Sequence, residues 1–263
     1  MGNEHNKYID IHCHCLPGLD DGPLNNSEAV ELCRSLVADG IGTVIATVHQ
    51  LGRYDTTNNA AKIRDAVNAM NEQLRENDID LCIMPGGDVR LDERIPLLLQ
   101  TDNIMTLADG GLYLLLELPS EVFINIEPLL AELNDAGIST IISHPERCMA
   151  LDKHPEILEK WLEQASLQIT AGSLLGHFGQ RAQQTGWSYL EKRQAQFVAT
   201  DAHDRQKRYP CMNAAFDCIA TKLGPDIAHE VCVENPRHIL NGTHIINSIE
   251  SNSPEYSYGG SNN

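Results

Sequence analysis

The sequence predicts an α/β protein in which parallel strands close, or nearly close, into a single β/α barrel. Short runs rich in Val, Ile and Leu alternate with amphipathic stretches along almost the whole chain, which is typical of a parallel sheet covered by helices. About seven such strand–helix units fit into the 263 residues, and this number suits a barrel better than two separate domains. A doubly wound open sheet is the alternative.

The expected strands are the seven apolar runs, at residues 8–15, 42–48, 81–84, 112–118, 139–143, 167–171 and 196–200. Amphipathic stretches predict helices between and after them, at residues 26–39, 58–77, 92–100, 124–136, 154–165, 177–193 and 212–223. In the first helix, Ser27 suits the N-cap, apolar residues follow at helical spacing, and Gly40 ends the helix.

No linker or internal repeat divides the chain before its end, so one domain is expected over residues 1–247. From Ser248 the composition changes to Ser, Asn and Gly, which cannot bury a core. Residues 248–263 are therefore expected to form a disordered tail.

The charge of the chain limits its partners. With 19 Lys and Arg against 37 Asp and Glu, the formal net charge is −18, so a basic surface for nucleic acid is absent and anionic membranes should repel the protein. No apolar run approaches the roughly 20 residues that cross a bilayer, so membrane insertion is not expected. The eight cysteines form no CxxC pair, and without a visible secretory signal they are expected to be reduced thiols in a cytoplasmic protein.

Residues that can bind metal ions recur where the predicted strands end, in six of the seven cases. One His or Asp at such a place is commonly a hydrogen-bonded structural residue or a helix N-cap. In a β/α barrel, however, the C-terminal ends of all strands meet at one mouth, so this many are expected to form one site. The candidate ligands are His12, His14, Asp21, His49, Asp88, Glu117, His144, Asp201 and His203.

This set of imidazoles and carboxylates suits divalent Mn, Fe or Zn. It exceeds the need of one ion, so two or three ions are expected, with Asp88 and Glu117 as the bridging residues. Such a site would acidify water for hydrolysis. Arg147 and Arg208 follow His144 and His203 closely, and a guanidinium can clamp a phosphate, so a phosphoesterase is predicted.

Five segments, YIDIHCHCLPGLDDGP, IATVH, LLLEL, ISHPER and ATDAH, resemble the PHP (polymerase and histidinol phosphatase) superfamily. Within it, the chain is most similar to the bacterial manganese-dependent protein tyrosine phosphatases of capsular and exopolysaccharide synthesis, the CpsB/YwqE type. The resemblance runs from about Tyr8 to Gly242. It implies a distorted, TIM-like (β/α)7 barrel of PHP type, three metal ions with Mn²⁺ the first expectation, and a phosphotyrosine substrate.

The resemblance also implies roles for single residues and a partner. All nine candidate ligands stand at the positions of the family's metal ligands, and Arg147 and Arg208 match its substrate-binding arginines. The implied partner is the autophosphorylating tyrosine kinase that controls polysaccharide synthesis, while the oligomeric state is left open. The family usually has Glu where this chain has Asp88, which is one methylene shorter, so one metal is expected to bind more weakly.

Some alternative functions require different residues from those of a metal-dependent phosphoesterase. A Cys nucleophile in a Cys-x5-Arg loop is excluded, because no cysteine has Arg six positions later. A small-molecule phosphoesterase of the histidinol-phosphatase type remains the enzyme alternative. A barrel that binds metal without catalysis is the alternative from a different class, and the loss of ligand residues would be its sign.

Overall fold

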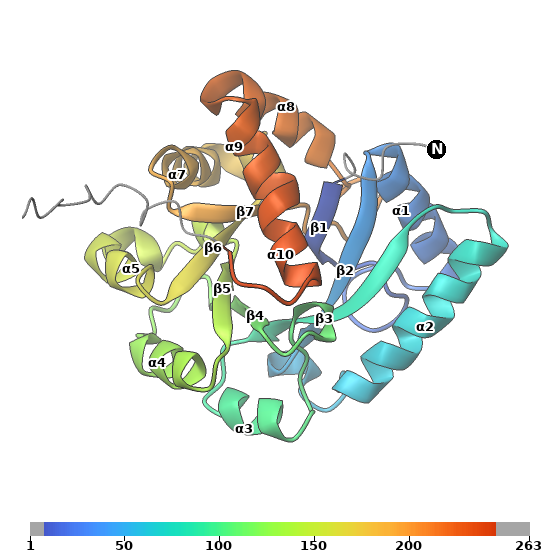
Figure 1. Ribbon diagram of the computed structural model, residues 1–263, viewed down its shortest axis with the longest axis horizontal. Helices are drawn as coiled ribbons and strands as arrows, with labels where there is room; N and C mark the ends of the chain where they lie inside the picture. Colours follow the sequence, from blue (N-terminus) through green and yellow to red (C-terminus); the bar gives the residue numbers. More distant parts are fainter. Residues whose placement is uncertain (1–7, 246–263) are drawn as a thin grey trace, which may run out of the picture.

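The computed structural model describes residues 8–245, in which seven parallel strands follow one another around a nearly closed barrel (Figure 1). Each strand pairs with the next in chain order. The strands are β1 (Tyr8–Cys13), β2 (Ile41–Gln50), β3 (Cys82–Arg90), β4 (Tyr113–Glu117), β5 (Ser139–Ser143), β6 (Ala165–Thr170) and β7 (Ala195–Ala199). The barrel prediction is confirmed, and the doubly wound sheet is wrong, because its strand order would reverse at a switch point. The predicted tail, residues 248–263, lies outside the described residues.

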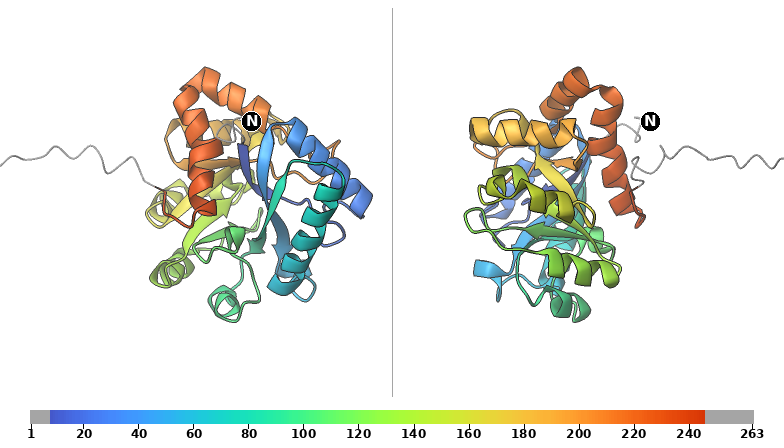
Figure 2. Two further views of the ribbon diagram at one scale, coloured as in Figure 1. Left: turned by 45° about the vertical axis from the view of Figure 1, so that its right-hand side comes forward. Right: turned by 90° about the vertical axis from the view of Figure 1, so that its left-hand side faces the viewer.

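Helices surround the strands, as the two views of Figure 2 show. The α-helices are α1 (Asn26–Ala38), α2 (Ala60–Glu76), α3 (Ile95–Gln100), α4 (Glu127–Asp135), α5 (Pro155–Trp161), α6 (Ala171–Leu174), α7 (Gly179–Glu191), α8 (Met212–Leu223), α9 (Pro225–His229) and α10 (Asn235–Leu240). Short 3-10 turns are η2 (Gly52–Tyr54), η3 (Leu107–Asp109), η4 (Pro145–Arg147) and η5 (Leu151–Lys153), and η6 (Glu230–Glu234) is a π-helix. None of these described helices is both long and apolar enough to cross a bilayer.

Two sequence predictions of element boundaries are wrong. Helix α1 is capped by Asn25, not Ser27, because the Asn25 side chain accepts the Glu28 N–H and the Glu28 carboxylate accepts the Leu24 N–H in return. Strand β3 extends past residue 84 as far as Arg90 and includes Gly86 and Gly87. A Cβ on Gly87 would lie 2.3 Å from Gln50 Oε1, so glycine here lets the Gln50 side chain of the neighbouring strand β2 pack closely against β3.

Helices α6, α9 and α10 were not predicted. Each has six residues or fewer, and proline stands in the first turn of both α9 and α10, so none carries a long helical period. Helix α10 nevertheless has a clear position, across the end of the barrel that faces the viewer in Figure 1. Its Ile239 packs into the barrel interior and closes that end.

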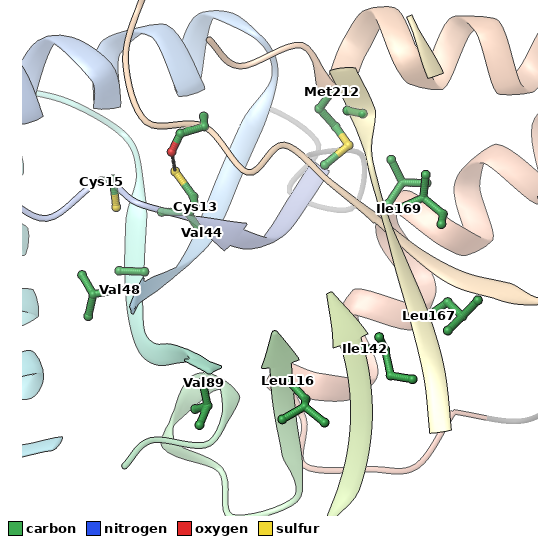
Figure 3. Packing of buried hydrophobic residues seen from close by; sticks show 14 of the residues in the cluster. Cys13, Cys15, Val44, Val48, Val89, Leu116, Ile142, Leu167, Ile169 and Met212 are labelled. Carbon is green, nitrogen blue, oxygen red and sulfur yellow. Dashed lines mark hydrogen bonds between the residues drawn. The ribbon is translucent and has the colours of Figure 1, made fainter. Parts of the chain in front are cut away.

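Buried apolar side chains form two groups, one on each face of the barrel wall. The outer group packs between strands and helices and includes Val44, Val89, Leu116 and Ile142 (Figure 3). The inner group, called the lower core below, fills the barrel at the N-terminal ends of the strands. Its buried members are Ile9, Ile11, Ile45, Leu107, Tyr113, Leu115, Ile141, Phe197, Ala199 and Ile239.

An irregular seam between β1 and β7 closes the barrel. The Asp201 N–H donates to His12 O at 2.7 Å, and the His14 N–H donates to Ala202 O at 2.9 Å. The pairing of β1 with β2 also shifts register between Asp10 and Cys13. As a result, Ile9 and Ile11 belong to the lower core, whereas Cys13 and Cys15 belong to the outer group.

Candidate metal centre

The inward-facing positions of the strands change from apolar to polar over two residues. On β4, Leu115 is in the lower core and Glu117 ends the strand above it, and Ala199 stands in the same relation to Asp201 at the end of β7. This follows from the period of two in a strand, which returns every second side chain to the same face. His49 and Asp88 lie inside β2 and β3, where they are paired neighbours, rather than after these strands as expected.

The chain backbone is strained at two of the candidate ligands. His144 has φ 35° and Asp201 has φ 53°, both in the left-handed region that is unfavourable for side chains other than glycine. Each lies directly after a strand, β5 and β7 respectively, where the chain turns sharply at the mouth. Such strain persists only where the surrounding structure imposes it, and it concentrates at functional sites.

The structure brings all nine predicted ligands together. They fall into four overlapping groups, and within each group the ligand atoms lie within 4.8 Å of one another. The groups are His14–Asp21–His49–His203, His12–Asp88–His144, His12–His14–Asp201 and His49–Asp88–Glu117. Because His12, His14, His49 and Asp88 each belong to two groups, the geometry suits adjacent ions better than one isolated ion.

Two buried carboxylate oxygens indicate that cations fit this cluster. Asp201 Oδ1 accepts no hydrogen bond within the described residues, although His12 Nε2 and His14 Nε2 lie 3.2 and 3.4 Å away. Asp88 Oδ2 is unsatisfied too, and its nearest imidazole nitrogen is His49 Nδ1 at 3.2 Å. An unpaired buried carboxylate oxygen is costly, whereas a divalent cation among imidazoles and carboxylates would satisfy it.

Two further residues outside the nine candidate ligands orient the histidines. Gln168 Oε1 lies 2.8 Å from His12 Nδ1, and Asp20 Oδ2 lies 2.7 Å from His14 Nδ1. Each contact engages Nδ1 and leaves Nε2 for the cluster, and the two Nε2 atoms are 3.2 Å apart. Gln168 lies on β6, the strand without a candidate ligand, so a polar residue at a buried inward position was the available signal.

Burial and neighbouring charges act against each other at the imidazoles. Burial lowers the pKa of His49, but contacts with Asp21 and Asp88 outweigh it and raise the pKa to about 11. Burial also lowers the pKa of His14, but the contact with Asp20 outweighs it and raises the pKa to about 9. Burial and the His14 charge lower the pKa of His203 to about 4. The cluster therefore mixes protonated and neutral imidazoles, and a metal ion entering it must displace protons.

A cavity of about 650 Å³ opens at the mouth and is lined by Arg53, Arg90, Arg147 and Arg208 together with four of the candidate ligands. Arg147 and Arg208 each place Nη2 on Asp201 Oδ2, at 2.6 and 2.5 Å. Arg205, which is close to Arg208 in the sequence, pairs with Glu31 on the exposed surface instead. The described cavity thus holds concentrated positive charge on a strongly acidic chain.

Fold and site together define a β/α barrel protein equipped to hold several metal ions next to an anion. The family of capsular polysaccharide synthesis proteins CpsB/CapC matches residues 8–241. The chain belongs to this family.

Individual relatives agree with that assignment. The tyrosine-protein phosphatase YwqE of Bacillus subtilis is 33% identical over 235 residues, covering 88% of this chain and 91% of YwqE. The tyrosine-protein phosphatase CpsB of Streptococcus pneumoniae is 28% identical over 240 residues, covering 88% of this chain and 98% of CpsB. A crystal structure from a study of these two proteins, described there as unique metal-dependent tyrosine phosphatases, superposes with a TM-score of 0.86 at 31% identity. It covers 90% of this chain and 96% of that one.

Proposed function

We propose that this protein is a metal-dependent tyrosine phosphatase that hydrolyses phosphotyrosine on a protein partner. The observation that carries the proposal is the cluster of nine ligand-type residues beside two arginines that converge on one carboxylate oxygen. Family membership and the high coverage of the phosphatases YwqE and CpsB support the same activity. The partner is a tyrosine kinase of polysaccharide synthesis, and the reaction takes place in the cytoplasm.

The nine residues would hold two to three divalent ions, with Mn²⁺ as the expected metal and Fe or Zn as the alternatives. Asp88 belongs to two of the groups, so it is placed to bridge neighbouring ions. When bound, the ions would acidify water and neutralise the phosphate. Gln168 and Asp20 keep His12 and His14 in the orientation that ligation requires.

Arg147 and Arg208 hold the phosphate group. Both now pair with Asp201 Oδ2, and a phosphate oxygen offers the same kind of acceptor to two guanidinium groups. The Arg147 guanidinium also lies 4.6 Å from the centre of the Phe178 ring, and the Arg147 carbonyl accepts a hydrogen bond from Arg181. These contacts fix the turn η4 that carries Arg147, so its charge stays at the edge of the metal cluster.

The test is hydrolysis of a phosphotyrosine peptide by chelator-stripped protein, with and without added Mn²⁺, beside a His144→Ala variant. Turnover that Mn²⁺ restores in the wild type, and not in the variant, is the expected result. Absence of turnover despite measured metal occupancy would overturn the proposal. Hydrolysis of small phosphate esters without hydrolysis of the peptide would instead favour a small-molecule phosphoesterase.

A further inference from the structure

Arg53 and Arg90 also line the cavity, but neither is a candidate metal ligand or one of the two arginines proposed to bind the phosphate. Arg90 ends β3, and Arg53 lies in η2 just after β2. Arg147 and Arg208 follow β5 and β7 instead. The strands run around the barrel in chain order, so β2 and β3 lie on a different arc of the barrel from β5 and β7 (Figure 1). The two pairs of arginines that line the cavity therefore come from different arcs of the mouth.

Local packing holds the first pair in place. A Cβ on Gly52 would lie 3.4 Å from Arg90 Cγ, so the η2 turn rests against the aliphatic stem of Arg90. The Arg53 guanidinium lies 4.7 Å from the centre of the Tyr54 ring and donates to Tyr54 Oη at 2.7 Å. Tyr54 in turn stacks on His49, with ring centroids 5.7 Å apart and planes 10° apart. The two guanidinium groups are therefore held beside the candidate metal ligands, and both keep part of their surface open to solvent.

The carboxylate partners of these arginines are themselves candidate metal ligands. Arg90 Nη1 lies 3.1 Å from Glu117 Oε2, and Arg53 Nη2 lies 3.6 Å from Asp21 Oδ2. A carboxylate that binds a divalent cation has much less negative charge left for a neighbouring guanidinium. With metals bound, two always-charged arginines of 39% and 69% exposure would thus face the cavity without a fully charged partner.

We infer that Arg53 and Arg90 form a second anion subsite, which recognises an acidic group next to the phosphotyrosine of the substrate. This inference rests on the proposed function. One phosphate presents three terminal oxygens, and Arg147, Arg208 and bound metal ions would be enough to hold them. The shared chemistry of the second ligand is an anionic oxygen group, which can be a side-chain carboxylate or a second phosphate.

A competing explanation is that Arg90 only orients Glu117. In that case its loss would weaken metal binding and slow every substrate by the same factor. A subsite instead changes the ratio of kcat/KM between an acidic and a neutral substrate, since only the acidic one uses it. The ratio is independent of the overall activity, so it separates the two explanations.

The experiment uses metal-loaded full-length protein and four phosphotyrosine peptides that differ at one flanking position: Asp, Asn, a second phosphotyrosine, or tyrosine. The expected ratio of kcat/KM for acidic over neutral peptides is about 10-fold, the size of one charge-assisted contact. Arg90→Gln and Arg53→Gln should each move this ratio towards one, while Arg90→Lys retains part of it. Arg34→Gln, an exposed arginine on α1 outside the cavity, should leave the ratio unchanged.

The Asp and second-phosphotyrosine peptides show which acidic group the subsite prefers. A wild-type ratio of one for both, or an unchanged ratio in Arg90→Gln and Arg53→Gln, would overturn the subsite. If none of the peptides is hydrolysed, their affinity for the same metal-loaded proteins is measured by fluorescence anisotropy instead. Tighter binding of acidic peptides that is lost in Arg90→Gln supports the subsite, and a complete lack of hydrolysis would then count only against the proposed phosphatase activity.

Discussion

The barrel interior has two levels that differ in almost every property although the same strands build them. In the lower core, Ile45, Leu115 and Ala199 pack with no exposed surface. Further along these strands, or just beyond their ends, stand His49, Glu117 and Asp201, in a cluster with unsatisfied carboxylate oxygens. Burial acts against both shifts, but neighbouring carboxylates raise the pKa of His49 and the Arg147 charge lowers the pKa of Asp201. The lower core gains free energy of folding from buried apolar surface, whereas the ligand level buries carboxylates with unsatisfied oxygens that bound cations would compensate.

The residues that stabilise the barrel and the residues of the candidate site thus lie on neighbouring positions of the same strands. Residues of a functional site are often unfavourable for folding, and the rest of the fold compensates for them. Here the compensation lies directly beneath the site. Substitutions at the two levels should therefore produce different signatures, one in turnover and metal binding, the other in the free energy of unfolding.

The largest effect is expected from a change at the ligand level. Asp201→Asn keeps the shape of the side chain but removes the charge that attracts both cations and the two arginines. Since changes to residues that merely orient ligands cost 10- to 100-fold, loss of this ligand should lower kcat/KM by more than about 100-fold. Steady-state hydrolysis and Mn²⁺ calorimetry measure this. Turnover close to that of the wild type would show that Asp201 is not a ligand.

The opposite signature is expected in the lower core. Phe197 is fully buried, so Phe197→Ala should lower the free energy of unfolding by about 3–5 kcal/mol through lost burial and a cavity. Urea denaturation of the metal-free protein measures the change. The folded fraction should still bind Mn²⁺ with nearly wild-type affinity. A similar loss of metal affinity in Phe197→Ala and Asp201→Asn would mean that the two levels are not energetically separate.

An intermediate effect is expected from the residue that orients His12 from β6. Gln168→Leu removes the contact with His12 Nδ1, and Mn²⁺ affinity should fall by about 10- to 100-fold. The matched control is Gln183→Leu, because Gln183 donates to Leu174 O on the outside of the barrel. Calorimetric titration of both variants gives the comparison. Equal affinities in the two variants would contradict an orienting role for Gln168.

The period of two along each strand made the inward-facing side chains of this barrel predictable from the sequence. The alternation that places Leu115 and Glu117 on one face is local, so the ligand level could be read from the order of residues. The register shift after Asp10 could not be predicted from the sequence, since it depends on how β1 pairs with β2 in the folded barrel. Gln168 was missed for a related reason, because only the folded barrel brings β6 beside His12.

The smallest effect is expected from a change at Asp88, which should raise metal affinity and lower stability. Asp88→Glu restores the residue that the family usually has, and the longer side chain should reach a bridged ion better, so affinity for the weakest-bound Mn²⁺ should rise a few-fold. Asp88 is fully buried, however, and the added methylene should lower the free energy of unfolding of the metal-free protein by about 1 kcal/mol. Mn²⁺ titration with a competing chelator measures the first quantity, and urea denaturation without metal measures the second. A fall in metal affinity together with stability would contradict this prediction. It would mean that the contacts of Asp88 with Ser143 and His49, rather than the bound ions, require the shorter carboxylate at this position.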